Sequence, residues 1–296
     1  MTLFDDSPRR IFKDTRWLQP LSNPPEDKPL CRKADMKQIA GFISQVFSAG
    51  QSRNIFICGR PGTGKTVCIR HLLDEVNKHA QDTGISVTGV YVNAGRTRTP
   101  YYTMLEIVEC LGLKVPDAGW QMFRLKRAFE NILRKKAVVI AVDEVDAILL
   151  KEREPIIYYL NRQTKVTLIL ISNKMEDASK LPERALSTLQ PQLVILKPYT
   201  LEQIETILKK RIEYAFQPQV ISDKLLNIVA KKASEKGDIR LAFSILLSAG
   251  LSAEKANRSK ITIGDIESAV KNEAVIGTIK EIGALTKKLA EFDKRK

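Results

Sequence analysis

The chain has 296 residues, 44% of them hydrophobic, and a mean hydropathy of -0.17. This length suits roughly two domains of ~100 to 200 residues each. No apolar stretch approaches the ~20 residues that cross a bilayer, and the first residues lack the basic-then-apolar order of a secretion signal. We therefore expect a cytoplasmic protein that does not associate with a membrane.

The charge balance is strongly basic. Lys and Arg number 48 against 34 Asp and Glu, which gives a formal net charge of +14 and a pI near 9.6. Such a field suits contact with nucleic acid. A basic surface that favours solubility, or the Lys- and Glu-rich composition of a thermophile, explains the charge equally well. Charge alone leaves these alternatives open.

Prolines dominate the start of the chain. Because five of them interrupt residues 1–31, this segment is expected to form an extended arm without packed structure. The five are Pro8, Pro20, Pro24, Pro25 and Pro29. Apolar residues then recur at helical spacing from Met36 to Phe47, which predicts an amphipathic helix before the first strand.

The most specific motif follows the apolar run at residues 54–58, and it precedes a predicted helix. It reads Gly59-Arg60-Pro61-Gly62-Thr63-Gly64-Lys65-Thr66. Glycines at these positions let backbone N–H groups surround a phosphate, Lys65 would bridge the β- and γ-phosphates, and the Thr66 hydroxyl would ligate Mg²⁺. A chance match is the alternative, but the flanking strand and helix argue against it. The motif predicts binding of ATP with Mg²⁺.

Apolar runs and helical patterns alternate through the first two thirds of the chain. After the strand at 54–58, strands are predicted at residues 87–92, 137–142, 166–171 and 193–196, with helices at 65–79, 103–111, 120–136 and 155–163. Continuous apolar strands separated by helices indicate a parallel sheet covered on both faces. The predicted fold class is therefore α/β, with a five-stranded nucleotide-binding domain at residues 32–197.

After residue 197 only helical patterns follow. Helices are predicted at residues 200–214, 222–232, 237–250 and 262–271, with Thr200, Ser222 and Thr262 as N-terminal caps and Gly250 as a stop. These helices predict a small all-helical lid domain at residues 198–275. A basic amphipathic tail is expected at residues 276–296.

Two further strand ends carry polar residues suited to hydrolysis. Asp143 and Glu144 end the strand at 137–142, where ligands bind in open α/β sheets. Asp143 would hold Mg²⁺ through water, and Glu144 would orient and deprotonate the attacking water. A surface acidic turn is the alternative. Asn173, at the end of the next strand, would bring an amide toward the γ-phosphate, although Asn at such a position is commonly a turn residue.

Together these motifs resemble those of an AAA+ ATPase. The stretches at residues 142–146, 171–174 and 237–242 complete the AAA+ pattern. Those at 91–94, 98–101, 113–116, 181–189 and 237–250 resemble the archaeal origin-recognition initiators, relatives of the eukaryotic origin recognition complex and its helicase-loading partner. The resemblance runs from about Arg32 to Lys271, which is most of the chain.

The resemblance implies roles for further residues. Asn173 would be sensor 1, and Arg240 would be sensor 2, reaching the γ-phosphate from the lid. Arg184 would act in trans on the nucleotide of a neighbouring subunit; the chain has Pro182-Glu183 where the family commonly has Asp-Pro. The expected nucleotide-binding set also takes in Val67 and Tyr199.

The family inserts a helical DNA-contacting element between the second strand and the acidic motif. In this chain that region contains Arg96, Arg98, Tyr101 and Tyr102, a mixture suited to phosphate and groove contacts. Alternatively, the two tyrosines begin a helix and pack inward. Initiators of the family normally continue into a winged-helix domain, and this chain stops about where that domain would begin. We interpret it as a truncated chain or as a short paralogue with weakened DNA affinity.

The sequence thus predicts an ATP-binding, slowly hydrolysing replication-initiator switch, located with the nucleoid. Expected partners are double-stranded origin DNA and other initiator subunits or a replicative helicase, with a monomer in solution assembling on them. Two alternatives stay open. One is a different AAA+ role, such as a clamp-loader-like subunit or a transposition ATPase. The other is a regulator of a full-length initiator that does not itself bind DNA.

Overall fold

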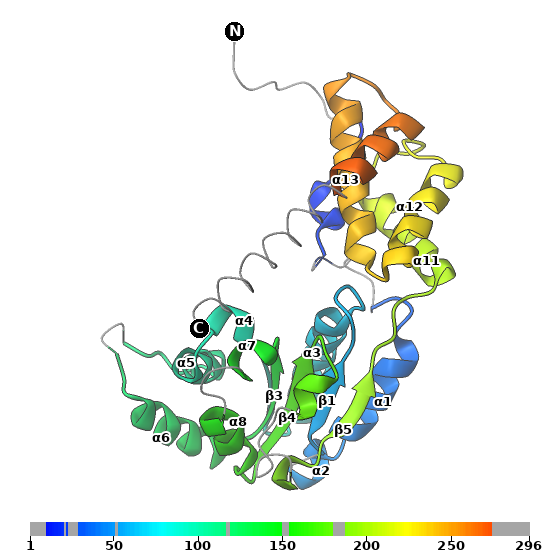
Figure 1. The fold of residues 1–296 in the computed structure, drawn as a ribbon. Helices are drawn as coiled ribbons and strands as arrows, with labels where there is room; N and C mark the ends of the chain where they lie inside the picture. The colour runs from blue at the N-terminus through cyan, green and yellow to red at the C-terminus, as the bar shows by residue number, and fades with distance from the viewer. Residues whose placement is uncertain are drawn as a thin grey trace, which may run out of the picture. The chain divides into compact units, whose positions relative to one another are not determined.

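The structure is a computed structural model that describes residues 10–20, 22, 29–50, 53–116, 119–149, 154–179 and 187–273. The chain forms two compact units (Figure 1). One comprises Cys31–Pro198; the other combines Met1–Leu30 with Tyr199–Lys296. Arg184 and the predicted tail at 276–296 lie outside the described residues. No helix in the described ranges is both long and apolar enough to cross a membrane.

A five-stranded parallel sheet forms the centre of the first unit, as predicted. Its strands are β1 (Ile55–Cys58), β2 (Val87–Asn93), β3 (Ala137–Asp143), β4 (Val166–Ser172) and β5 (Gln192–Ile195). Their order across the sheet is β2-β3-β4-β1-β5, and every pairing is parallel. Every residue of β3 and β4 is buried, because both faces of the sheet are covered.

Helices cover the two faces of the sheet. They are α1 (Lys33–Ile43), α2 (Val46–Ala49), α3 (Lys65–Thr83), α4 (Ala94–Thr97), α5 (Pro100–Cys110), α6 (Met122–Leu133), α7 (Asp146–Leu149), α8 (Glu154–Asn161) and α9 (Glu176–Ser179). One apolar core joins α5, α6 and α8 to one face, and a second joins α1 and α3 to the other. The single helix predicted from Met36 to Phe47 is divided into α1 and α2.

The parallel register brings three chain segments to one edge of the sheet. Asn93 pairs with Asp143 at the ends of β2 and β3, and Cys58 pairs with Ser172 at the ends of β1 and β4. The phosphate-loop motif, the acidic pair and Asn173 follow β1, β3 and β4 directly. The fold therefore places the residues that the sequence predicted for ATP binding and hydrolysis along a single edge of the sheet.

The second unit is helical. It contains α11 (Leu201–Ala215), α12 (Asp223–Lys236) and α13 (Ile239–Lys255), and residues 263–273 are also helical. Thr200 and Gln203 form a reciprocal capping box at the start of α11, and Ser222 caps α12. Buried leucine, isoleucine, valine and alanine residues on these helices form the core of the unit.

The start of the chain differs from the extended arm that the prolines predicted. Ile11, Phe12 and Leu18 are almost fully buried, and Thr15–Leu18 form a short 3-10 helix. Phe12 forms an isolated antiparallel bridge with Phe216, and their rings stack with centroids 5.0 Å apart. This segment belongs to the helical unit because the apolar side chains between its prolines pack there.

Gly250 also differs from the prediction, since it does not end a helix. α13 continues to Lys255, and Gly250 is buried within it. A Cβ atom at this position would lie 2.3 Å from Cζ of Phe12, which no real contact allows. Gly250 is therefore a packing residue that admits the Phe12 ring.

Candidate functional site

The glycines of the phosphate-loop motif are required for two different steric reasons. Gly62 and Gly64 have φ values of 77° and 84°, in the region that side chains disfavour. Gly59 has no room for a Cβ, which would lie 2.5 Å from the carbonyl oxygen of Leu196. Gly64 immediately precedes α3, so the free N–H groups of the first turn of that helix adjoin the loop.

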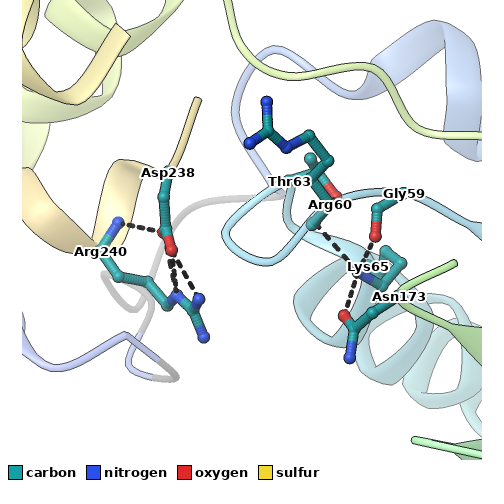
Figure 2. A network of polar contacts seen from close by, with 7 residues as sticks. All are labelled: Gly59, Arg60, Thr63, Lys65, Asn173, Asp238 and Arg240. Atoms are coloured by element: carbon teal, nitrogen blue, oxygen red, sulfur yellow. Dashed lines mark hydrogen bonds and ion pairs between the residues drawn. The ribbon is translucent and has the colours of Figure 1, made fainter. Parts of the chain in front are cut away.

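Lys65 occupies the centre of the loop (Figure 2). Its ammonium donates to the carbonyl oxygens of Gly59 at 2.6 Å and Arg60 at 3.1 Å, and to Oδ1 of Asn173 at 3.0 Å. The residue is buried. The structure thus brings together two predicted site residues that are 108 positions apart in the chain. Together they place a cation and an amide next to the loop that would surround the phosphates.

Asp143 is the second centre of the site, and three donors fix its carboxylate. Oδ2 accepts from the Thr66 hydroxyl at 2.5 Å and from the Tyr91 hydroxyl at 2.8 Å, while Oδ1 accepts from the N–H of Glu144 at 2.8 Å. Only 3% of Asp143 is exposed. The contact with Thr66 joins the phosphate loop to the acidic motif and brings together two residues that were predicted to hold Mg²⁺.

Tyr91 was not among the predicted site residues. Burial foremost, and then the negative charge of Asp143, raise its pKa to about 12. The phenol therefore keeps its proton at neutral pH and donates it to the carboxylate. The guanidinium carbon of Arg70 lies 4.3 Å from the centre of the Tyr91 ring, as in a cation–π contact. The strand register is the signal that could have revealed Tyr91, since it lies two residues before the partner of Asp143.

The side chain of Glu144 lies beside Gly95, just after the end of β2. Its φ of 51° is in the left-handed region, which is uncommon for a residue with a side chain. Gly95 makes room for it, because a Cβ there would lie 2.0 Å from Oε2 of Glu144. Glu144 and Tyr91 both line a pocket of about 490 Å³.

Ser172 and Asp177 hold the turn that presents Asn173. The Ser172 hydroxyl donates to Oδ2 of Asp177 at 2.5 Å and accepts from the N–H of Lys174 at 3.2 Å. Both side chains are almost fully buried. Sequence analysis missed this pair because nothing in its spacing distinguishes it from an ordinary turn.

The residues around the loop fit a triphosphate with Mg²⁺. The Thr66 hydroxyl donates its hydrogen to Asp143, so the lone pairs of the hydroxyl oxygen can bind a cation. Hydroxyl and carboxylate oxygens are the hard ligands that Mg²⁺ prefers, usually together with water and substrate phosphates. Lys65 and the backbone N–H groups of the loop would supply positive charge for the phosphates.

Other predicted residues lie on the helical unit or outside the described ranges. Arg240 is about half exposed, and its guanidinium pairs with the carboxylate of Asp238 (Figure 2), the residue that caps α13. Tyr199 is largely buried. Their roles toward the nucleotide stay predictions, as does that of Arg184.

The four residues predicted to contact DNA lie around the start of α5. Arg96 forms an ion pair with Glu106, and Arg98 donates to the carbonyl oxygen of Gly95 at 3.3 Å. Tyr101 packs against the apolar core of the sheet unit, as the inward-packing alternative has it. Tyr102, by contrast, is 56% exposed. Arg96, Arg98 and Tyr102 remain available at the surface.

The sheet order, the phosphate loop and the helical unit define an AAA+ ATPase domain with a lid. Two family descriptions agree with this class. "AAA domain" matches residues 49–176, and "Cdc6 AAA+ ATPase-type lid domain" matches residues 205–271.

Individual relatives specify the family. The chain is 33% identical to the ORC1-type DNA replication protein 1 of Sulfurisphaera tokodaii over 88% of its length, and 32% identical to the ORC1-type protein of Pyrococcus horikoshii over 86%. It spans 66% and 63% of those relatives. The solved structure of the Aeropyrum pernix ORC1 protein in complex with DNA matches with a TM-score of 0.80 at 28% identity, covering 89% of this chain and 70% of that one. The chain belongs to the ORC1-type family of AAA+ DNA replication proteins.

Proposed function

We propose that this protein is an ATP-dependent switch in the initiation of DNA replication, which binds origin DNA and hydrolyses ATP slowly. One observation carries the proposal. Lys65, Asn173, Thr66 and Asp143 come from three separate strand ends and are linked by hydrogen bonds around one phosphate loop. These hydrogen bonds hold the groups proposed to bind the phosphates and Mg²⁺ beside one another at one edge of the sheet.

Each residue of the site has a role in this proposal. Residues Gly59 to Val67 hold the phosphates, with Lys65 on the β- and γ-phosphates. Thr66 would hold Mg²⁺ together with Asp143, the latter through water, and the bound ion would supply positive charge for the phosphates. Glu144 orients the attacking water and takes its proton, and Asn173 holds that water beside the γ-phosphate.

The helical unit would make the protein a switch. We infer that Arg240 contacts the γ-phosphate in the ATP state, so that ATP and ADP favour different positions of the lid. Tyr199 would contact the nucleotide at the start of the lid. Arg184 would complete hydrolysis on a neighbouring subunit, so turnover by an isolated chain should be slow.

The proposed DNA contacts are Arg96, Arg98, Tyr101 and Tyr102. Support comes from the exposure of three of them at one end of α5 and from the net charge of +14. The A. pernix ORC1 protein has been solved in complex with DNA. Other initiator subunits or a replicative helicase would be the protein partners.

Substitution of Lys65 tests the nucleotide site. We expect Lys65→Ala to lower ATP affinity by roughly 100-fold or more, because it removes a desolvated cation from the phosphates. Lys78→Ala is the matched control, since Lys78 is an exposed lysine on the same helix. Calorimetric titration with ATP measures both, and DNA binding with and without ATP is the second readout. Equal ATP affinity of the two variants would refute the proposed site.

A further inference from the structure

Oδ2 of Asp143 has two hydroxyl donors, and only one of them belongs to the phosphate loop. Thr66 comes from the start of α3 and Tyr91 from the middle of β2, and their hydroxyls lie 2.5 and 2.8 Å from the same oxygen. The other oxygen is held by the N–H of Glu144. With three donors on a carboxylate that is 3% exposed, the carboxylate has little freedom to rotate.

The strand geometry explains why a tyrosine can reach this carboxylate. β2 and β3 are in parallel register, with Tyr91 opposite Ala141 and Asn93 opposite Asp143. Tyr91 and Asp143 are therefore diagonal neighbours on the same face of the sheet, a separation that suits a long aromatic side chain. The guanidinium of Arg70 also contacts the face of the Tyr91 ring, which restrains the phenol further.

We propose that Tyr91 is a positioning residue for Mg²⁺ binding, acting through Asp143. By sharing Oδ2 with Thr66, Tyr91 keeps the carboxylate turned toward the hydroxyl that would ligate the ion. Tyr91 itself contacts neither the ion nor the phosphates in this proposal. The inference rests on the proposed ATP site and adds to it Tyr91, which lies in the family-like stretch 91–94 but was given no role at the site from the sequence.

The test is the Tyr91→Phe substitution, which removes one oxygen and keeps the ring. ATP affinity is measured by calorimetry in excess Mg²⁺ and again in EDTA. We expect the gain in affinity that Mg²⁺ provides to fall roughly tenfold, within the range seen for residues that orient metal ligands. Affinity in EDTA should not change, because Tyr91 has no role toward the phosphates.

Tyr159→Phe is the matched control. Tyr159 is also partly buried, and its hydroxyl also donates to a carboxylate, that of Glu130 at 3.0 Å. It lies on α8, outside the phosphate-loop site. Thermal melting of the two variants should show similar losses of stability, whereas only Tyr91→Phe should alter the dependence on Mg²⁺.

A double-mutant cycle with Asp143→Asn tests whether Tyr91 acts through Asp143. If it does, Tyr91→Phe should have little further effect on Mg²⁺-dependent affinity in the Asp143→Asn background. An undiminished effect there would overturn the inference. So would a wild-type response to Mg²⁺ in Tyr91→Phe, or an equal loss of affinity in Mg²⁺ and in EDTA.

These outcomes separate the inference from the proposed function. If the wild-type protein bound ATP no better with Mg²⁺ than without it, the proposed site itself would be wrong. If Mg²⁺ raised the ATP affinity of the wild-type protein and of Tyr91→Phe equally, the proposed ATP site would be supported and only the role of Tyr91 would be refuted.

Discussion

Asp265 shows how much a single carboxylate can contribute to the helical unit. It accepts hydrogen bonds from the Arg258 guanidinium at 2.6 and 2.7 Å, from the Ser252 hydroxyl at 2.8 Å and from the N–H of Thr262 at 2.8 Å. The Arg258 contact foremost holds the pKa of this carboxyl well below its usual range, although burial acts in the opposite direction. The folded unit thus favours the ionised form.

This shift predicts acid sensitivity of the helical unit. Because the folded pKa is depressed, the contribution of Asp265 to stability is complete above the unfolded pKa of about 3.9 and is lost as the pH falls toward the folded value. Asp265→Asn should therefore lower the melting temperature at neutral pH, and the difference from wild type should shrink below about pH 4. Thermal melts across this range measure it. A difference that stayed constant with pH would exclude ionisation as its cause.

At the scale of elements, the contact between Phe12 and α13 attaches the start of the chain to the helical unit. Gly250→Ala would place a methyl group into the Phe12 ring, so we expect a loss of about 1 to 3 kcal/mol in the free energy of unfolding. Gly264→Ala is the control, because its nearest neighbour would be Oγ1 of Thr262 at 3.9 Å, an ordinary contact. Urea unfolding measures both. Similar losses in the two variants would show that the close approach to Phe12 does not matter.

The elements also show what the sequence could predict. Strand and helix positions in the sheet unit followed from local periodicity, and the strand ends fall within about one residue of the predicted ones. The burial of Ile11 and Phe12 could not be predicted in this way, because their partners lie around Phe216 and Gly250. Gly250 carries the local signature of a helix stop, and only a distant ring explains its place inside α13.

The residues of the candidate site also differ in whether local sequence could predict them. Lys65, Thr66, Asp143 and Asn173 could be predicted because each belongs to a motif with fixed spacing. Tyr91 could not, because its contact with Asp143 depends on the register of two strands separated by about 50 positions. The residues proposed to bind phosphate and Mg²⁺ lie in motifs whose spacing indicates their role, whereas the stretch that contains Tyr91 gives no sign of its contact with Asp143.

At the scale of the whole molecule, the net charge of +14 bears on the proposed binding of DNA. We expect affinity for duplex DNA to fall steeply with salt, because each phosphate contact releases a counterion. Arg98→Ala should lower affinity and reduce the slope of log affinity against log salt by about one contact, whereas Lys78→Ala should not. Fluorescence anisotropy on origin and random duplexes, with and without ATP, measures this. Equal affinity for both duplexes in every condition would contradict an origin-binding role.

The helical unit is assembled from two distant parts of the chain, and this delays its folding during synthesis. Lys13 bonds to the carbonyl oxygen of Glu213, 200 positions further along. A ribosome adding roughly 5 to 20 residues per second needs about 10 to 40 s to cover that distance. Throughout that interval Ile11 and Phe12 have no helices to bury them. The strands of the sheet are therefore all synthesised before the helices that bury Ile11 and Phe12. Until those helices are translated, these two apolar side chains remain exposed.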